Sequence, residues 1–171
     1  FVFFIRGTPL LVQIFLIYFG LGQFDWVRAS PLWFVLQAPF ACAVIAFALN
    51  TSAYTTVLLK GAIASVPETE VVACEALGMS RALMLRRIIF PRAMHMALPA
   101  YSNEVVMILK GTSLASTITL LDLMGVTNQI IAQTYQTLPF LCLVGLIYLS
   151  LNIMIIRAFR WVEKRANCYL A

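Results

Sequence analysis

Long runs of apolar residues alternate along the chain with short segments that carry its charges. The clearest run, residues 138–156, holds nineteen residues without a charge and ends before Arg157. Residues 37–59 form a second uncharged run, with a polar patch at 50–52. A helix needs about 20 apolar residues to cross the roughly 30 Å of hydrocarbon in a bilayer. Both runs are therefore predicted to be membrane-spanning helices.

Two further apolar runs are interrupted. Residues 1–21 are broken by the sequence RGTP, and residues 93–109, which can extend to 125, are interrupted by Glu104, Lys110 and Asp122. The whole pattern predicts an all-α membrane protein with about four transmembrane helices. The chain begins inside an apolar run, with neither an initiator Met nor a charged leader. We expect it to be an N-terminally truncated piece of a longer protein.

The composition excludes a soluble globular domain. Apolar residues make up 62% of the 171 residues and charged residues only 11%, whereas soluble domains are roughly 45–50% apolar. Lipid must therefore cover part of the surface. The net charge of +5 comes without a basic patch interleaved with aromatic residues, so nucleic acid is not an expected partner. The cysteines are widely spaced and are predicted to be reduced packing residues: Cys42, Cys74, Cys142 and Cys168.

The distribution of Lys and Arg predicts the orientation in the membrane. Five lie between residues 60 and 92, four between 157 and 165, and one, Arg28, between 23 and 37. Because Lys and Arg accumulate in cytoplasmic loops, the central loop and the C-terminal tail are predicted to be cytoplasmic. The two predicted spans between them supply the even number of crossings that this requires.

The central loop, residues 67–91, has more structure than a topology signal needs. Pro67 suits the start of a helix, Gly78 suits its end, and Ser80 can cap a second helix that continues until Pro91. The residues leave two interpretations open. Either the first helix is a compact apolar tip around which a partner's cleft closes, or the loop lies on the bilayer. In the second case the arginines contact lipid phosphates: Arg81, Arg86, Arg87 and Arg92.

Six stretches carry a resemblance to a known family: GTPLLVQIFLIYFG, LNTSAYTT, GAIASVPE, ALGMS, YSNEVV and TSLASTITLLDLMG. Together they make nearly the whole chain resemble the permease subunits of bacterial ATP-binding-cassette importers for polar amino acids, and most closely the arginine-transporter permeases. The resemblance implies a type I importer transmembrane domain over residues 1–171, with one further span before residue 1 and five in all. It also favours the first interpretation of the loop, as a cytoplasmic coupling helix.

In this family the cytoplasmic loop carries a signature of Glu-Ala-Ala, three residues and Gly, which docks in a groove of the ATPase subunit. Here the Gly and Ala73 match, whereas Val72 replaces the Glu and Cys74 replaces an Ala. Docking by shape is still expected, and Glu70 or Glu75 could replace the missing carboxylate. The residues expected to couple to the ATPase are Pro67, Glu70, Ala73, Cys74, Gly78 and Pro91.

The chain lacks the phosphate-binding pattern of an ATPase, a Gly followed after four residues by Gly-Lys-Ser/Thr. It is therefore predicted not to be an enzyme and to bind no cofactor. The resemblance implies that two partner ATPase subunits bind ATP and Mg²⁺. It also implies a second permease protomer, sister or identical, and a periplasmic amino-acid-binding protein, all at a bacterial inner membrane. His95 stands alone and is predicted to be an interfacial side chain, not a metal ligand.

Ionisable side chains at membrane depth cost roughly 2.5–3.5 kcal/mol and usually face a cavity or a partner. Glu104 and Lys110 fall on different helix faces, whereas Asn103 and Lys110, seven residues apart, share one. A cationic amino acid needs an acidic group for its side chain and a donor for its carboxylate. Glu104 is predicted to bind the cationic group, and Asn103 or Lys110 the carboxylate. The full predicted substrate pathway is Asn103, Glu104, Lys110, Thr112, Ser113 and Asp122.

These assignments have structural alternatives. Glu104 could instead pair with Arg6 or with the sister subunit, and Lys110 and Asp122 could lie at the membrane interface with their charges in water. Arg6 is expected to mark the cytoplasmic end of its span, and Gln13 is a further candidate for the pathway.

The predicted function is that of a permease subunit for L-arginine or related basic and polar amino acids. Alternatives within the class are importers of histidine, lysine, ornithine or opines. A membrane-embedded enzyme would need a convergent set of catalytic groups, which one His without paired intramembrane aspartates does not supply. A passive channel or a structural membrane protein would not need the helix, elbow and helix of the central loop.

Overall fold

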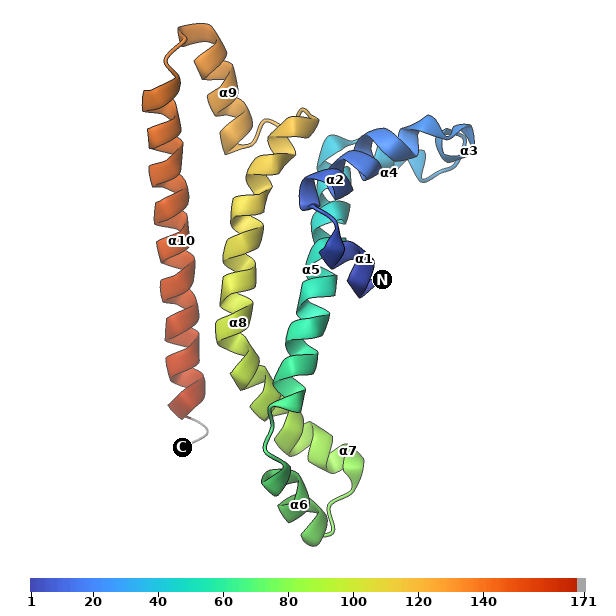
Figure 1. Ribbon diagram of the computed structural model, residues 1–171, viewed down its shortest axis with the longest axis vertical. Helices are drawn as coiled ribbons and strands as arrows, with labels where there is room; N and C mark the ends of the chain where they lie inside the picture. Colours follow the sequence, from blue (N-terminus) through green and yellow to red (C-terminus); the bar gives the residue numbers. More distant parts are fainter. Residues whose placement is uncertain (169–171) are drawn as a thin grey trace.

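The computed structural model describes residues 1–168, with side chains to residue 165, and in this part the chain is mostly helical and contains no strand. Three long helices, α5 (Pro39–Ala64), α8 (Phe90–Gly111) and α10 (Thr137–Cys168), run along the long axis (Figure 1). α8 packs against both α5 and α10. The prediction of an all-α protein is confirmed.

Within the described residues, two helices are long and apolar enough to cross a membrane: Pro39–Ala64 and Thr137–Arg165. A third candidate is the bent pair Arg81–Ile118 and Leu123–Thr134, whose two parts meet at 51°. This pair contains the predicted span at residues 93–125. The predicted span at residues 1–21 is split into α1 (Val2–Gly7) and α2 (Leu10–Phe15), which continues through η1 (Leu16–Gly20) and η2 (Leu21–Gln23).

The break between α1 and α2 follows from Pro9. Proline has no N–H and disfavours helical backbone in the residue before it, and Thr8 is accordingly extended, with φ −111° and ψ 141°. The buried Gln13 side chain donates to the carbonyl oxygens of Ile5 at 2.7 Å and Thr8 at 3.0 Å. These bonds satisfy carbonyl groups that the break leaves without a helical partner.

Short helices gather at one end of the molecule (Figure 1). α3 (Asp25–Arg28) and α4 (Trp33–Leu36) connect η2 to α5, while η4 (Thr112–Ile118) and α9 (Leu123–Thr134) connect α8 to α10. Asp122 caps α9, because its Oδ1 accepts from the Gly125 N–H at 2.8 Å. All these elements lie at the end of the molecule opposite α6 (Figure 1).

Two clusters of mostly small buried residues hold the long helices together. The first joins α2, α5 and η4 and consists of Ile14, Ala43, Ala46, Ala115 and Ile118. The second joins the end of α5 to the start of α8 and consists of Ala62, Val66, Ala93 and Ala97. Small side chains let helix backbones approach closely, as is common in membrane proteins. Between the two clusters, α5 and α8 leave space at mid-length.

The segment between α5 and α8 forms a helical hairpin of α6 (Glu68–Ala76) and α7 (Arg81–Met84), which we call the α6–α7 hairpin. Gly78 has φ +73°, its N–H donates to the Glu75 carbonyl, and the Met79 N–H donates to the Cys74 carbonyl. This is the Schellman arrangement of a helix C-terminus. Ser80 then caps α7 through the Leu83 N–H. The predicted helix, elbow and helix are confirmed.

The expectation that the second helix ends at Pro91 is wrong. Helical structure runs from α7 through the π-helix η3 (Leu85–Ile89) into α8, and Pro91 lies in the first turn of α8. A proline cannot donate to the carbonyl four residues back, and its ring crowds that carbonyl. The wider π-turn, in which the Phe90 N–H donates to the Leu85 carbonyl, accommodates it without ending the helix.

Candidate functional site

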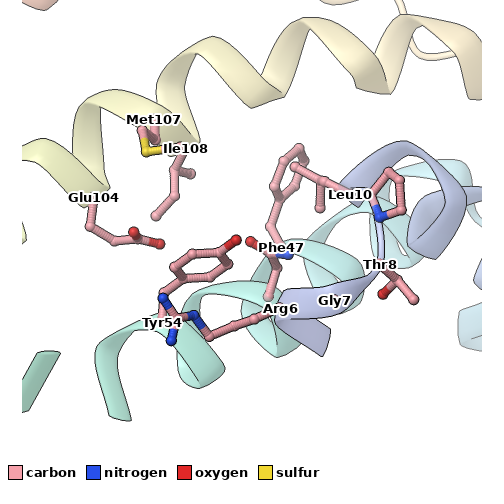
Figure 2. Close-up of a pocket in the computed structure, with 11 residues that line it drawn as sticks. Arg6, Gly7, Thr8, Leu10, Phe47, Tyr54, Glu104, Met107 and Ile108 are labelled. Atoms are coloured by element: carbon pink, nitrogen blue, oxygen red, sulfur yellow. The ribbon is translucent and has the colours of Figure 1, made fainter. Parts of the chain in front are cut away.

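A cavity of about 380 Å³ opens between α1, α5 and α8 at mid-length of the long helices. Its size falls within the about 300–1,000 Å³ typical of small-molecule sites. Polar and apolar groups from the three helices surround it (Figure 2). The lining residues are Arg6, Gly7, Thr8, Pro9, Leu10, Phe47, Asn50, Tyr54, Glu104, Met107 and Ile108.

The cavity brings together two opposite charges and an aromatic ring. Glu104, only 8% exposed, directs its carboxylate into the cavity toward Tyr54 (Figure 2). The Arg6 guanidinium lies 5.0 Å from the centroid of the Tyr54 ring, the geometry of a cation–π contact. No ion pair joins Arg6 to Glu104 in the described part of the chain. The Arg6 and Glu104 side chains therefore line the same cavity without forming an ion pair across it.

The expectation that Arg6 marks the cytoplasmic end of a span is wrong. The break at Thr8–Pro9 turns α1 so that it lies beside the middle of α5 (Figure 1), where Arg6 reaches Tyr54. Arg6 is thus distant in the fold from the α6–α7 hairpin. The alternative in which Glu104 pairs with Arg6 is met only in part: both side chains line the cavity, but they form no ion pair among the described residues.

Asn50 links the cavity to the break between α1 and α2. It lines the cavity, and its Nδ2 donates to Gln13 Oε1 at 3.1 Å. The amide group of Gln13 donates in turn to the Thr8 hydroxyl and to two carbonyl groups. Gln13 does not line the cavity. Through these hydrogen bonds Gln13 orients the Asn50 side chain and the α1 backbone.

Of the six residues predicted for the substrate pathway, only Glu104 lines this cavity. Asn103 and Lys110 are exposed and do not line the cavity. The hydroxyls of Thr112 and Ser113 donate to carbonyls within their own helical turn, each at 2.7 Å. Asp122 caps α9, and its Oδ2 is buried without a hydrogen-bond partner among the described residues.

The residues predicted to couple to an ATPase all lie in or next to the α6–α7 hairpin, at the same end of the molecule as the end of α10 (Figure 1). Pro67 is the N-cap of α6, and Ala73 is exposed. Cys74 is buried at 7% exposure, so it packs inward. Apolar side chains at the tip face outward, with Val72 at 62% and Leu77 at 80% exposure. The hairpin therefore presents an apolar tip.

The described side chains include His95 and three of the four cysteines. Nε2 of His95 is buried without a hydrogen-bond partner, and the described residues contain no cluster of three metal-ligating side chains. Cys42, Cys74 and Cys142 are free thiols. Cys168 lies outside the residues whose side chains are described.

Sequence reasoning paired Arg6 with Glu104 only as a structural alternative, and it did not place Asn50 or Tyr54 beside Glu104. One signal was present: Arg6 precedes the break at Pro9, and Asn50 and Tyr54 are four residues apart and so share a face of α5. What could not be read from the sequence was that α1 folds back across that face.

Residues 1–167 match the family described as binding-protein-dependent transport system inner membrane component. An arginine ABC transporter permease protein of Escherichia coli (strain K12) is 46% identical over 95% of this chain and 73% of its own length. An octopine transport system permease protein of Rhizobium radiobacter is 44% identical over 98% of this chain and 71% of its own. For a nopaline transport system permease protein of Agrobacterium fabrum these values are 48%, 99% and 71%.

The fold is also similar to a solved structure. A crystal structure of an amino acid ABC transporter with histidines superimposes with a TM-score of 0.84 at 32% identity. The match covers 96% of this chain and 72% of that chain.

Proposed function

The chain belongs to the family of binding-protein-dependent transport system inner membrane components, and from this membership we propose that it is the permease subunit of an importer for amino acids with a cationic side chain, such as L-arginine. The observation that carries the substrate class is the mid-length cavity, into which the buried Glu104 carboxylate points (Figure 2). A carboxylate with little access to water favours a cationic ligand.

The cavity offers complementary groups to both ends of such an amino acid. Glu104 binds the cationic side chain, and the Tyr54 ring adds a face on which a guanidinium can stack. Arg6 and Asn50, which line the same cavity, donate to the carboxylate. They take the role that sequence reasoning gave to Asn103 or Lys110, because those two residues do not line the cavity.

The α6–α7 hairpin faces the cytoplasm and docks by its apolar tip on one of two ATPase subunits, which bind ATP and Mg²⁺. A second permease protomer and lipid cover the exposed apolar faces, of which α10 contributes Leu143, Leu146 and Leu149. A periplasmic binding protein delivers the substrate at the end that carries α3, α4 and α9. A bacterial inner membrane is the corresponding location.

The second candidate substrate is an opine. It is supported by the similarity to the octopine and nopaline permeases, which is as high as that to the arginine permease. A single site can be tested for both classes, because arginine and an opine would compete for the same cavity.

Uptake of radiolabelled arginine into liposomes that hold the complete complex tests the proposal. Lysine, histidine, ornithine, octopine and glutamine serve as competitors. We expect Glu104→Gln to reduce arginine uptake at sub-saturating concentration by about 10-fold or more, since a hydrogen bond to a charged group is worth about 1.5–3 kcal/mol. Glu163→Gln on α10, outside the cavity, is the matched control and should leave uptake unchanged. Equal uptake by Glu104→Gln and the parent would refute the binding role.

A further inference from the structure

One ion pair ties the α6–α7 hairpin to the long helix that follows it. Nη2 of Arg92 lies 2.9 Å from Oε1 of Glu70. Glu70 belongs to the first turn of α6, and Arg92 to the first turn of α8. No other ion pair is present among residues 1–165, whose side chains the structure describes.

The other two attachments of the hairpin are irregular. α6 is joined to α5 by the turn at residues 65–67, and α7 is joined to α8 through the π-helix η3. The turn and the π-helix both interrupt regular α-helical hydrogen bonding, and π-turns within helices frequently occur at functional sites. Without the ion pair, the hairpin could pivot about these two points. With it, α6 is held to α8 directly.

The pair lies beside the packed base of the long helices. Arg92 is followed by Ala93, which packs with Ala62, Val66 and Ala97 in the second core cluster. Further along α8, about 18 Å away at 1.5 Å per residue, the same helix carries Glu104 into the cavity. A displacement of α6 that reaches Arg92 therefore reaches the helix that forms one wall of the cavity, although Pro99 interrupts the hydrogen bonding of α8 between Arg92 and Glu104.

We propose that Glu70 and Arg92 are positioning residues: their ion pair sets the angle between the α6–α7 hairpin and α8, so that movement of the hairpin moves the wall that carries Glu104. This inference rests on the proposed function. The Arg92 and Glu70 side chains are 40% and 31% exposed. Pairs exposed to this degree shift an equilibrium by about 1.4- to 5-fold. That is too little to decide folding, but it is enough to change which orientation of the hairpin is populated.

The test uses the complete complex in proteoliposomes and measures substrate transported per ATP hydrolysed. We expect Glu70→Gln and Arg92→Gln each to lower this ratio by about 1.4- to 5-fold, with a parent-like amount of permease in the membrane. The double variant should be no worse than either single variant, because the first substitution has already broken the pair.

Two substitutions remove the same charges nearby without touching the pair. Glu68→Gln lies in the same first turn of α6, and Arg87→Gln lies in η3; both residues are exposed and outside the ion pair. Both variants should keep the parent ratio. This separates loss of the pair from a general effect of charge or of the helix dipole.

The outcomes distinguish this inference from the proposed function. A purely structural role would lower the amount of folded permease and leave the ratio unchanged. An unchanged ratio in both single variants, or independent effects that multiply in the double variant, overturns the inference and leaves the proposed function standing. A parent complex whose ATP hydrolysis does not respond to the binding protein overturns both.

Discussion

Substitutions at Gly78 test directly whether the α6–α7 hairpin transmits movement. At this position the effect of a substitution on the backbone can be separated from steric contacts of the added side chain. The φ of Gly78 is +73°, and a Cβ built there meets nothing within 4 Å. The cost of a substitution is therefore a backbone cost alone. Alanine in left-handed backbone costs roughly 1–2 kcal/mol, and asparagine less, because its side chain tolerates this conformation.

Proline should be the most disruptive substitution at this position. Its ring fixes φ near about −65°, which the observed elbow excludes, and it removes the N–H that donates to the Glu75 carbonyl at 2.9 Å. A cost of one or two kcal/mol lowers the population of a conformation about 5- to 30-fold. We expect coupling to fall in the order parent, Gly78→Asn, Gly78→Ala, Gly78→Pro, with coupled hydrolysis abolished in the last.

The assay is ATP hydrolysis stimulated by the binding protein in proteoliposomes, with membrane insertion measured separately for each variant. Insertion should stay at the parent level, because Gly78 lies outside the long apolar helices. Gly61→Ala, in helical backbone of α5 with nothing within 4 Å of its Cβ, is the matched control and should couple normally. Parent-like coupling in Gly78→Pro would refute the view that the elbow transmits movement.

Three further predictions address the supports of the site and the orientation. Gln13→Met should lower the unfolding free energy by about 1–3 kcal/mol, because buried carbonyl groups lose their donor. The same change at the exposed Gln23 should be neutral. Thermal unfolding of the purified complex measures both effects. Gly125→Ala should cost about 1–3 kcal/mol in the same assay, because its Cβ would lie 2.4 Å from the Leu120 carbonyl oxygen, while Gly145→Ala, with nothing within 4 Å, should be tolerated. Single cysteines at Leu77 and Phe34, both 80% exposed, report the orientation in a cysteine-free chain expressed without its ATPase partners. Leu77→Cys should react with an impermeant maleimide only in inside-out vesicles, and Phe34→Cys only in right-side-out vesicles. The reverse pattern would invert the proposed orientation.

The α6–α7 hairpin shows which parts of this fold can be predicted from sequence. A proline before α6, a glycine at φ +73° and a serine that caps α7 act within a few residues of their own position. Such signals depend on local hydrogen bonding and backbone sterics, which the chain carries wherever it is placed. Pro91 shows the limit of this reasoning, because a π-turn upstream let the helix continue through it.

The cavity shows the opposite case. Glu104 could be singled out because a carboxylate in an apolar run is costly unless it faces a cavity or a partner. Arg6 was named as a possible partner, but a shared cavity with Tyr54 could not be predicted, because Arg6, Tyr54 and Glu104 come from three different helices. Two other predicted residues, Lys110 and Asn103, have suitable chemistry, yet they do not line the cavity.

By itself, the sequence determined the helical class, the long apolar helices, the hairpin with its elbow and the choice of Glu104. Hydropathy and capping depend on residues close together in the chain, so predictions based on them need no knowledge of the tertiary structure. Only the tertiary structure decided that α1 folds back beside α5, that Gln13 supports the break at Pro9 and that Glu70 meets Arg92. These contacts depend on the angles at which helices pack, and those angles are set by side chains distant in sequence.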